Sequence, residues 1–436
     1  MSITNPLEPF FDRLRQGATL VWRGKVLQVV GNLIESEGPV CSIGESCEIL
    51  ARSGDRYFGE VVGFRGSTVL SMVLENPQGI RFGDTILASG IRPSIRVGPE
   101  LLGRVIDPTG RPLDGQGDYR AERRVPVDES APLPLDRVPI REVLGCGIRA
   151  IDGFITCGRG QRIGIFGGSG VGKSTLLGMM ARGTSADIIV LALVGERGRE
   201  VGEFLEVIGE EGRKRSVVVV STSDQSPLLR LRAALAASAI AEYFAYSGKH
   251  VLLVADSLTR FAMAQREIGL LAGEPPTVKG YTPSVLNALA RLVERAGSFQ
   301  TGSITAFYTV LMEGDDQQDP VADTVRSLLD GHVVLDRKLA MKNHYPPIAI
   351  LDSLSRLMPS IASREHLQRA GTLRQMLASY ARSEDLIRIG AYQKGADQVL
   401  DRAIEILPQL NQFLHQAPHE IASFPDAVNT LLQIAG

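Results

Sequence analysis

The chain has 436 residues, a formal net charge of −2 and a pI near 6.4, and 44% of its residues are hydrophobic. This length predicts about two to four domains, and the near-neutral charge argues against a helicase or another protein that binds nucleic acid through a broad basic surface. No run approaches the length of a membrane span, and the N-terminus lacks the layout of a signal peptide, so we expect a cytoplasmic protein.

Residues 1–20 are the first expected segment. Leu7, Phe10, Phe11 and Leu14 are spaced to share one face of a short helix, which either docks a partner or packs on the body of the protein. Residues 21–92 then consist of short β-rich runs, which Gly, Asp and Asn separate about every 8 to 12 residues. This pattern predicts a small closed β-barrel domain.

Residues 93–358 are expected to form a central α/β domain. A connector rich in Pro and Gly opens it, and apolar strand-like runs then alternate with helical stretches. The expected strands are IGIFG, IIVLALVG, SVVVVST, VLLVAD, SITAFYTV, GHVVLD and IAIL. Such near-continuous apolar runs predict a parallel sheet covered on both faces. Over 359–436 the apolar residues recur only at helical spacing, which predicts a C-terminal helical bundle.

The run GGSGVGKST lies between an expected strand and an expected helix and satisfies the phosphate-binding pattern G-x-x-x-x-G-K-[ST]. Its glycines let successive backbone N–H groups point at phosphate oxygens, with a helix N-terminus behind them. We expect Lys173 to reach the β- and γ-phosphates and Ser174 to ligate Mg²⁺. The expected nucleotide-binding residues are Gly167, Gly168, Ser169, Gly170, Val171, Gly172, Lys173, Ser174 and Thr175.

Charged residues follow two further expected strands. VLLVAD ends at Asp256, where a carboxylate can hold a Mg²⁺-bound water beside the phosphate loop; a solvated strand end is the alternative. In VGERGRE, a carboxylate can polarise an attacking water and an arginine can balance charge on the γ-phosphate. By itself this segment is equally consistent with a solvated loop.

Several long motifs in a fixed order resemble one family. They are the phosphate loop, VGERGRE, DSLTRFAMAQREIGLLAGEPPTVKGYTPSV from Asp256, GSITAFYTVLMEGDDQQDPVADTVRSLLDGHVVLDRKLA from Gly302, and HYPPIAILDSLSR from His344. This series resembles the catalytic ATPases of type III export systems, a branch of the rotary ATP synthase catalytic-subunit family that includes the flagellar protein-export ATPase. EGDDQQDP and RFAMAQREI resemble the flagellar branch more than the virulence-secretion branch.

The resemblance implies a small N-terminal β-barrel, a central RecA-like α/β domain with a mostly parallel sheet, and a C-terminal α-helical bundle. Within the central domain, Glu196 matches the carboxylate that activates the hydrolytic water. Arg197 and Arg260 match arginines near the γ-phosphate. Asp256 matches the acid on the Mg²⁺ side, which with Lys173 and Ser174 implies ATP and Mg²⁺ as substrate and cofactor.

Two more residues receive roles from the resemblance alone. Tyr345 matches the aromatic that stacks on adenine, and Arg356 matches the arginine finger that reaches a neighbouring subunit's site. A packed aromatic and a surface arginine are the alternatives. Because Glu196 and Arg356 lie on one chain, a finger acting in trans implies a ring of six identical copies with ATP at the interfaces. A finger acting within the same chain stays open, and so does a monomer that assembles only under some conditions.

The resulting hypothesis is a Mg-dependent ATP hydrolase of a type III export apparatus, flagellar in its motifs, that couples hydrolysis in a homohexamer to delivery or unfolding of export substrates. Expected partners are a regulator at residues 1–20, the export gate, chaperones and the inner face of the cell membrane. The alternatives are a virulence-type secretion ATPase, a noncatalytic ring subunit, against which Glu196 argues, and an RNA translocase. Sparse aromatics without a basic stripe in the barrel segment make nucleic acid an unexpected partner. The near-neutral loop at 390–398 leaves a stalk contact open.

Overall fold

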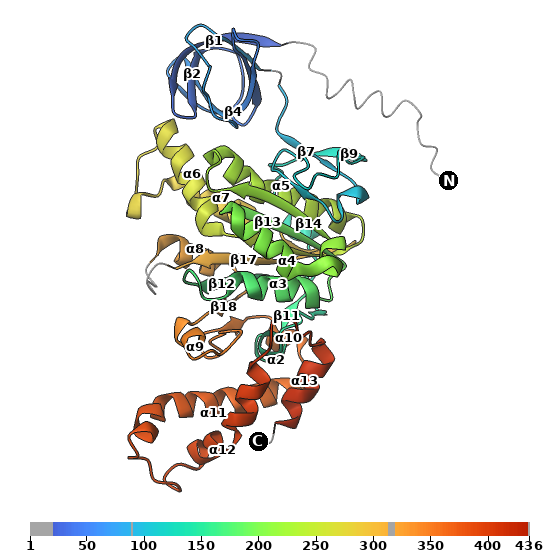
Figure 1. The fold of residues 1–436 in the computed structure, drawn as a ribbon, viewed down its shortest axis with the longest axis vertical. Coiled ribbons are helices and arrows are strands. Elements are labelled where there is room, and N and C mark those ends of the chain that lie inside the picture. The colour runs from blue at the N-terminus through green and yellow to red at the C-terminus, as the bar shows by residue number, and fades with distance from the viewer. Residues whose placement is uncertain (1–20, 89, 313–318, 435–436) are drawn as a thin grey trace, which may run out of the picture.

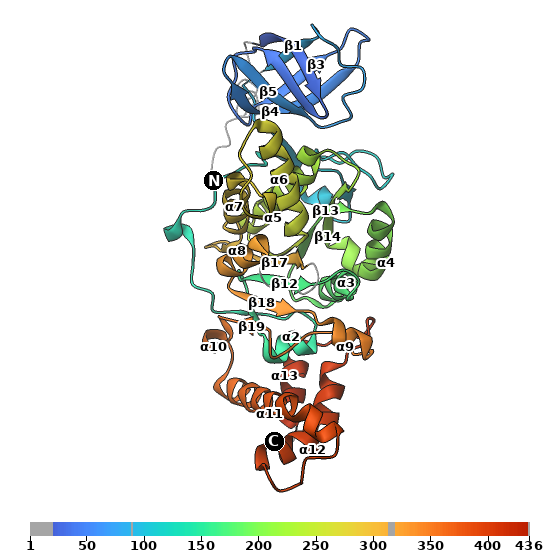
Figure 2. The same ribbon diagram turned by 90° about the vertical axis from the view of Figure 1, so that its left-hand side faces the viewer.

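The computed structural model describes residues 21–88, 90–312 and 319–434. The helix expected within residues 1–20 lies outside these ranges, as does most of the EGDDQQDP motif. Figures 1 and 2 show three parts stacked along the long axis: a β-barrel at one end, a sheet between helices in the middle, and helices at the other end. This architecture confirms the expected fold class.

The first part is a closed barrel of six strands in the order β1-β2-β5-β4-β3-β6. The strands are β1 (Trp22–Val30), β2 (Leu33–Glu37), β3 (Ser46–Leu50), β4 (Arg56–Arg65), β5 (Thr68–Val73) and β6 (Thr85–Ala88). Alternate side chains point inward, so Val26, Ile34, Ile49 and Ile86 are fully buried in its core. Closure leaves no unpaired strand edge for another chain to extend.

The segment between the barrel and the phosphate loop contains more structure than the expected connector. Two of its strands, β7 (Ser94–Val97) and β9 (Arg123–Pro126), pair antiparallel, and β8 (Val105–Ile106) joins the edge of the central sheet beside β14 (Ser216–Thr222). Only two residues form β8, too few to show a periodicity in sequence. Pairing with the sheet therefore creates this strand.

The central sheet has the order β19-β18-β12-β17-β15-β13-β14-β8, and β16 pairs with β17. Its other strands are β12 (Arg162–Gly167), β13 (Ile188–Glu196), β15 (His250–Asp256), β16 (Gly297–Ser298), β17 (Ser303–Leu311), β18 (Gly331–Val334) and β19 (Leu354–Ser355). A separate pair consists of β10 (Val143–Leu144) and β11 (Cys157–Gly158). The long strands run parallel, and every residue of β13 is buried, as the apolar runs predicted.

Helices cover both faces of this sheet (Figure 1). On one face, α5 (Pro227–Tyr246), α6 (Leu258–Ala272), α7 (Pro283–Val293) and α8 (Pro320–Leu328) form a core with Val190, Ala192 and Val194 of β13. On the other face, α2 (Arg149–Phe154), α3 (Lys173–Gly183) and α4 (Gly198–Lys214) form a core with the alternate residues Ile189, Leu191 and Leu193. The short helix α9 (Arg337–Met341) follows β18.

The C-terminal part is helical, as expected, with α10 (Met358–Ile361), α11 (Arg364–Arg388), α12 (Gln398–Leu414) and α13 (Phe424–Gln433). Hydrogen bonds join it to the central part. The Arg149 guanidinium on α2 donates to the Phe413 carbonyl oxygen, at 2.8 Å, and to the His415 carbonyl and Glu420 carboxylate. The barrel is joined at the opposite end, where Arg232 of α5 forms an ion pair with Glu60 of β4.

One expected strand is wrong. The run IAIL (348–351) makes only an isolated bridge, between Ile348 and Leu335. The cause lies in Ser353, whose Oγ accepts from the Val334 N–H at 2.9 Å and donates to the Ala349 carbonyl at 2.7 Å. A side chain thus takes the β18 amide that a neighbouring strand would have used. The strand that does pair with β18 is β19, a few residues later.

None of the helices in the described ranges combines the length and the hydropathy of a bilayer-spanning segment.

Candidate nucleotide site

The phosphate loop joins β12 to α3, the strand-to-helix turn that the sequence predicted. Gly170 and Gly172 have φ angles of 77° and 89°, a left-handed backbone that favours glycine. Among the described residues, no side chain caps the N-terminus of α3. Its first amides are therefore left for an anion, with the positive end of the helix dipole behind them.

Lys173 and Asp256 meet at the edge of the sheet. Asp256 ends β15 and is 2% exposed, and its Oδ1 lies 2.7 Å from the Lys173 ammonium in the first turn of α3. The hydroxyl of Thr309, on the adjacent strand β17, donates to the same carboxylate oxygen at 2.6 Å. The structure therefore brings the lysine of the phosphate loop and the expected Mg²⁺-side acid together, and it adds Thr309, which the sequence did not single out.

Glu196 and Arg260 form a second ion pair beside the first. Glu196 is the last residue of β13, 6% exposed, and Arg260 lies in the first turn of α6, which the Ser257 side chain caps. Burial raises the pKa of Glu196 above its ordinary value; the hydrogen bond from Arg260 opposes this, and the charge of Asp256 adds to it. A carboxyl in this environment holds its proton more tightly than a solvated one.

The backbone before Glu196 would be strained by a side chain, and the neighbouring arginines would have to shift to admit one. Gly195 has a φ of 64°, and a Cβ there would lie 3.3 Å from Cδ of Arg260 and 3.4 Å from Cδ of Arg230. Arg230 in turn forms an ion pair with Glu267, at 2.6 Å. The glycine therefore lets two arginine side chains pack directly against the strand end that presents Glu196.

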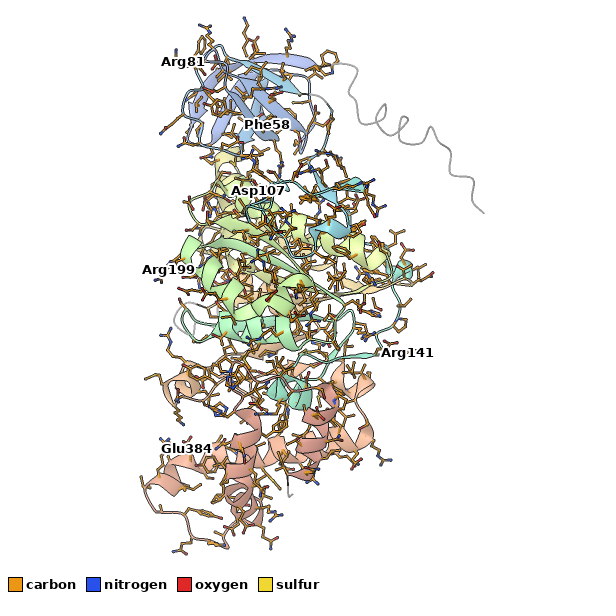
Figure 3. All side chains as sticks on the ribbon, turned by 45° about the vertical axis from the view of Figure 1, so that its right-hand side comes forward. Phe58, Arg81, Asp107, Arg141, Arg199 and Glu384 are labelled. Carbon is orange, nitrogen blue, oxygen red and sulfur yellow. The ribbon has the colours of Figure 1, made fainter. Side chains whose placement is uncertain are left out.

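Arg197 points away from this group. Its side chain is 68% exposed and lies 3.7 Å from Glu200 one turn along α4. Arg199 of the same segment also projects from the side of the central part (Figure 3). The structure thus brings Glu196 but not Arg197 to the group formed by Arg260 and Asp256, so the two neighbours in the sequence motif occupy different environments.

Tyr345 lies against the phosphate loop. A Cβ on Gly172 would be 3.5 Å from Cε1 of its ring, and the backbone carbonyl of Tyr345 accepts from the Gln416 N–H at 2.9 Å. The ring is 36% exposed, so one part of it packs and another part is left for a ligand. Arg337 is a further neighbour that the sequence did not indicate, since its guanidinium donates to the Ser169 carbonyl at 3.3 Å.

Arg356 lies at the other end of the sheet. Its backbone N–H donates to the Asp330 carbonyl at 2.9 Å, and the Asp330 N–H donates to the Arg162 carbonyl at 2.9 Å. Arg162 begins β12 and Gly167 ends it, so Arg356 and the phosphate loop are about 16 Å apart along the strand direction. The structure therefore does not support a finger that acts on the site of its own chain, and the Arg356 side chain is exposed.

Three family models match the chain. They are the nucleotide-binding domain of the ATP synthase alpha/beta family over residues 147–355, the β-barrel domain of that family over 26–90, and the type III secretion EscN ATPase C-terminal domain over 362–433.

Curated relatives match along nearly the full length. A flagellum-specific ATP synthase of Bacillus subtilis is 52% identical over 95% of this chain and 95% of its own. A type 3 secretion system ATPase of Xanthomonas euvesicatoria is 48% identical over 94% and 93%. The chain belongs to the family of flagellar and type III secretion ATPases. A solved structure of assembled EscN from enteropathogenic E. coli, in complex with its central stalk EscO, superposes with a TM-score of 0.87 at 43% identity, covering 94% of this chain and 99% of that one.

Membership confirms the main interpretation of the sequence: the chain is an ATP-hydrolysing enzyme of the type III export family rather than a noncatalytic ring subunit or an RNA translocase. The relatives carry both flagellar and type 3 secretion names at similar identity, so they do not separate the two branches of the family.

The geometry suits this ATPase to phosphoryl chemistry. Two cations, Lys173 and Arg260, each face an acid, Asp256 and Glu196, at the carboxyl ends of neighbouring parallel strands. Both pairs are largely removed from water, where electrostatic interactions are strong.

Proposed function

We propose that this ATPase hydrolyses ATP with Mg²⁺ in a ring of six copies, and that hydrolysis drives delivery and unfolding of export substrates. The observation that carries the proposal is the separation of Arg356 from its own phosphate loop by the length of β12. An arginine finger in that position serves a neighbouring copy, and a ring of identical copies gives every site one finger. The assembled form of EscN, a relative, supports this arrangement.

Mg²⁺ fits the residues near the phosphate loop. Ser174, next to Lys173 in the first turn of α3, and Asp256 supply the hard oxygen donors that Mg²⁺ prefers, and phosphate oxygens with water complete such sites. The Thr309 hydroxyl fixes the orientation of the Asp256 carboxylate. We infer that Ser174 and Asp256 would hold the ion. Bound there, Mg²⁺ would neutralise charge on the transferred phosphate.

Glu196 acts as the base in this proposal. ATP draws Lys173 to its β- and γ-phosphates and Arg260 to its γ-phosphate, and the Glu196 carboxylate is then free to orient a water and accept its proton. The pKa of Glu196, raised by burial, makes the carboxylate a stronger proton acceptor. Arg197 has a role near the γ-phosphate only if it leaves Glu200, and Tyr345 stacks on adenine.

Partners and location are also proposed from the relatives and the sequence. The EscO stalk bound to EscN supports a stalk-like partner for this chain, and residues 1–20 are the proposed site for a regulator. Export substrates, their chaperones and the export gate would be met in the cytoplasm, with peripheral association at the inner face of the cell membrane. The flagellar assignment rests on EGDDQQDP and RFAMAQREI.

Hydrolysis by mixed variants tests the ring. ATP turnover is measured over a range of protein concentrations for the native chain, Glu196→Gln, Arg356→Ala and an equal mixture of the two variants. We expect both variants to be inactive and the mixture to regain about a quarter of native activity, because half of the copies retain each group and an interface needs one of each. Arg382→Ala, an exposed arginine on α11, is the matched control and should behave like the native chain.

Three results would each contradict part of the proposal. Native turnover of Glu196→Gln would show that Glu196 is not the base. An inactive mixture of variants that still assemble would show that the glutamate and the arginine are not shared between copies. Turnover per chain that does not change with protein concentration, with no assembled species present, would contradict assembly from monomers.

A further inference from the structure

Gln161 is a fully buried polar residue that follows the turn at Arg159 and Gly160 and directly precedes β12. Its side-chain oxygen accepts from the Gly158 N–H at 2.8 Å. Its side-chain amide donates to Ser355 Oγ at 3.0 Å and to the Asp330 carbonyl at 3.2 Å. Both amide contacts go to the segments that flank Arg356, because Ser355 precedes it and Asp330 accepts its backbone N–H.

Ser355 continues the same network. Its hydroxyl is buried and donates to the Thr156 carbonyl at 2.8 Å, and it accepts from the Met358 N–H at 3.3 Å. These bonds fix the chain on both sides of Arg356, while β19 itself has only two residues and pairs only with β18 among the described strands. A strand this short depends on side-chain bonds for its position.

The contacts of the Arg356 side chain with described residues do little to fix its direction. It is exposed, and no hydrogen bond or ion pair with a described residue fixes its guanidinium. It lies near His332 of β18, since burial and then the charges of Arg326 and Arg356 lower the pKa of that histidine. The direction of the side chain therefore follows from its backbone, which Gln161 and Ser355 hold.

We propose that Gln161 and Ser355 are positioning residues for the arginine finger: they aim Arg356 at the ATP of a neighbouring copy. This inference rests on the proposed function, in which Arg356 acts in trans. Neither residue touches the nucleotide site of its own chain, since both lie at the end of β12 opposite the phosphate loop. Their loss should therefore impair the neighbour's site and spare their own.

Mixing variants distinguishes this role from a purely structural one. Gln161→Met removes both amide bonds at similar volume, and Ser355→Ala removes the hydroxyl. We expect each to lower kcat about 10- to 100-fold, as small misplacements of a catalytic group do, with KM for ATP within about twofold of native because the phosphate loop is untouched. Ser238→Ala, which removes an equally buried serine hydroxyl from α5, is the control and should keep native kcat.

The decisive measurement is complementation. Gln161→Met mixed with Glu196→Gln should recover activity to about a quarter of native, because the first copy supplies an intact glutamate and the second an intact finger. Gln161→Met mixed with Arg356→Ala should gain no activity over the separate variants, because both copies have a defective arginine finger. Ser355→Ala is tested in the same two mixtures.

The possible outcomes separate the two ideas. If Arg356→Ala and Glu196→Gln complement each other but neither Gln161→Met nor Ser355→Ala complements Glu196→Gln, the positioning role is wrong and the ring stands. If Arg356→Ala and Glu196→Gln fail to complement, the proposed function itself fails. Native kcat in both Gln161→Met and Ser355→Ala would also overturn the positioning role.

Discussion

Replacing Asp256 by Asn tests the buried pair that holds the phosphate loop before nucleotide binds. The Lys173 side chain is 11% exposed and that of Asp256 is 3% exposed, so the substitution leaves an ammonium with little water and no counter-charge. Removing one partner of a buried pair destabilises a protein by about 3 to 5 kcal/mol. At about 2 to 4 °C per kcal/mol for a unit of this size, the unfolding midpoint of the central part should fall by about 6 to 20 °C.

The assay is thermal unfolding of the native chain and of Asp256→Asn, each with and without ATP in the presence of a chelator. We expect Mg²⁺-free ATP to stabilise the variant more than the native chain, because phosphate supplies the partner that Lys173 has lost and no acid competes for it. Glu211→Gln removes one partner of an exposed pair with Lys214 and should leave the midpoint unchanged. An Asp256→Asn midpoint equal to the native one, or an ATP effect no larger than native, would refute the reasoning.

Three other expectations follow from the same geometry. The kcat/KM for ATP should fall on acidification as Glu196 of the free enzyme takes up a proton. Arg260→Ala should move that acidic limb of the kcat/KM profile to higher pH, since the guanidinium lowers the pKa that burial raises; a limb that stays or moves to lower pH contradicts this. Gly195→Ala should reduce kcat about tenfold or more by displacing Arg260, while circular dichroism stays native; native kcat would show that the site tolerates the methyl group. The buried hydrogen bond from Arg104 holds the pKa of Asp114 well below its usual range, so the stability that this pair contributes is present above about pH 4 and is lost as pH falls below it. In acid titrations of unfolding, Asp114→Asn should be less stable than the native chain at pH 7, and its stability should depend less on pH. An unchanged pH profile of stability would argue against the pair.

Local signals in the sequence were enough to predict most of the fold. The phosphate loop needs only its own glycines and the flanking apolar runs, and Asp256 and Glu196 come at strand ends that meet because parallel strands end at one edge. The barrel was predictable from turn spacing, since each hairpin closes between neighbours in the chain.

What the sequence could not supply depends on contacts between distant segments. Thr309 and Arg337 reach the site only because β17 and α9 pack beside the phosphate loop, and although both lie in the long motif that begins at Gly302, nothing in that motif marks them as site residues. The direction of Arg197 depends on where α4 begins. The position of Arg356 depends on the order β19-β18-β12, which pairs segments about 190 residues apart in sequence. Short strands such as β19 exist only in that context.

The strand β12 has one more consequence for the proposed ring. Its carboxyl end opens into the phosphate loop of its own site, and its amino end, through Gln161, holds the finger that enters the next site. A shift of β12 along its axis when nucleotide binds would therefore move Arg356 in the neighbouring copy's site, without any helix having to rotate. Repeated around the ring, such a shift would couple each nucleotide site to the site of one neighbouring copy and not to that of the other. The order in which the sites hydrolyse ATP would then depend on this six-residue strand.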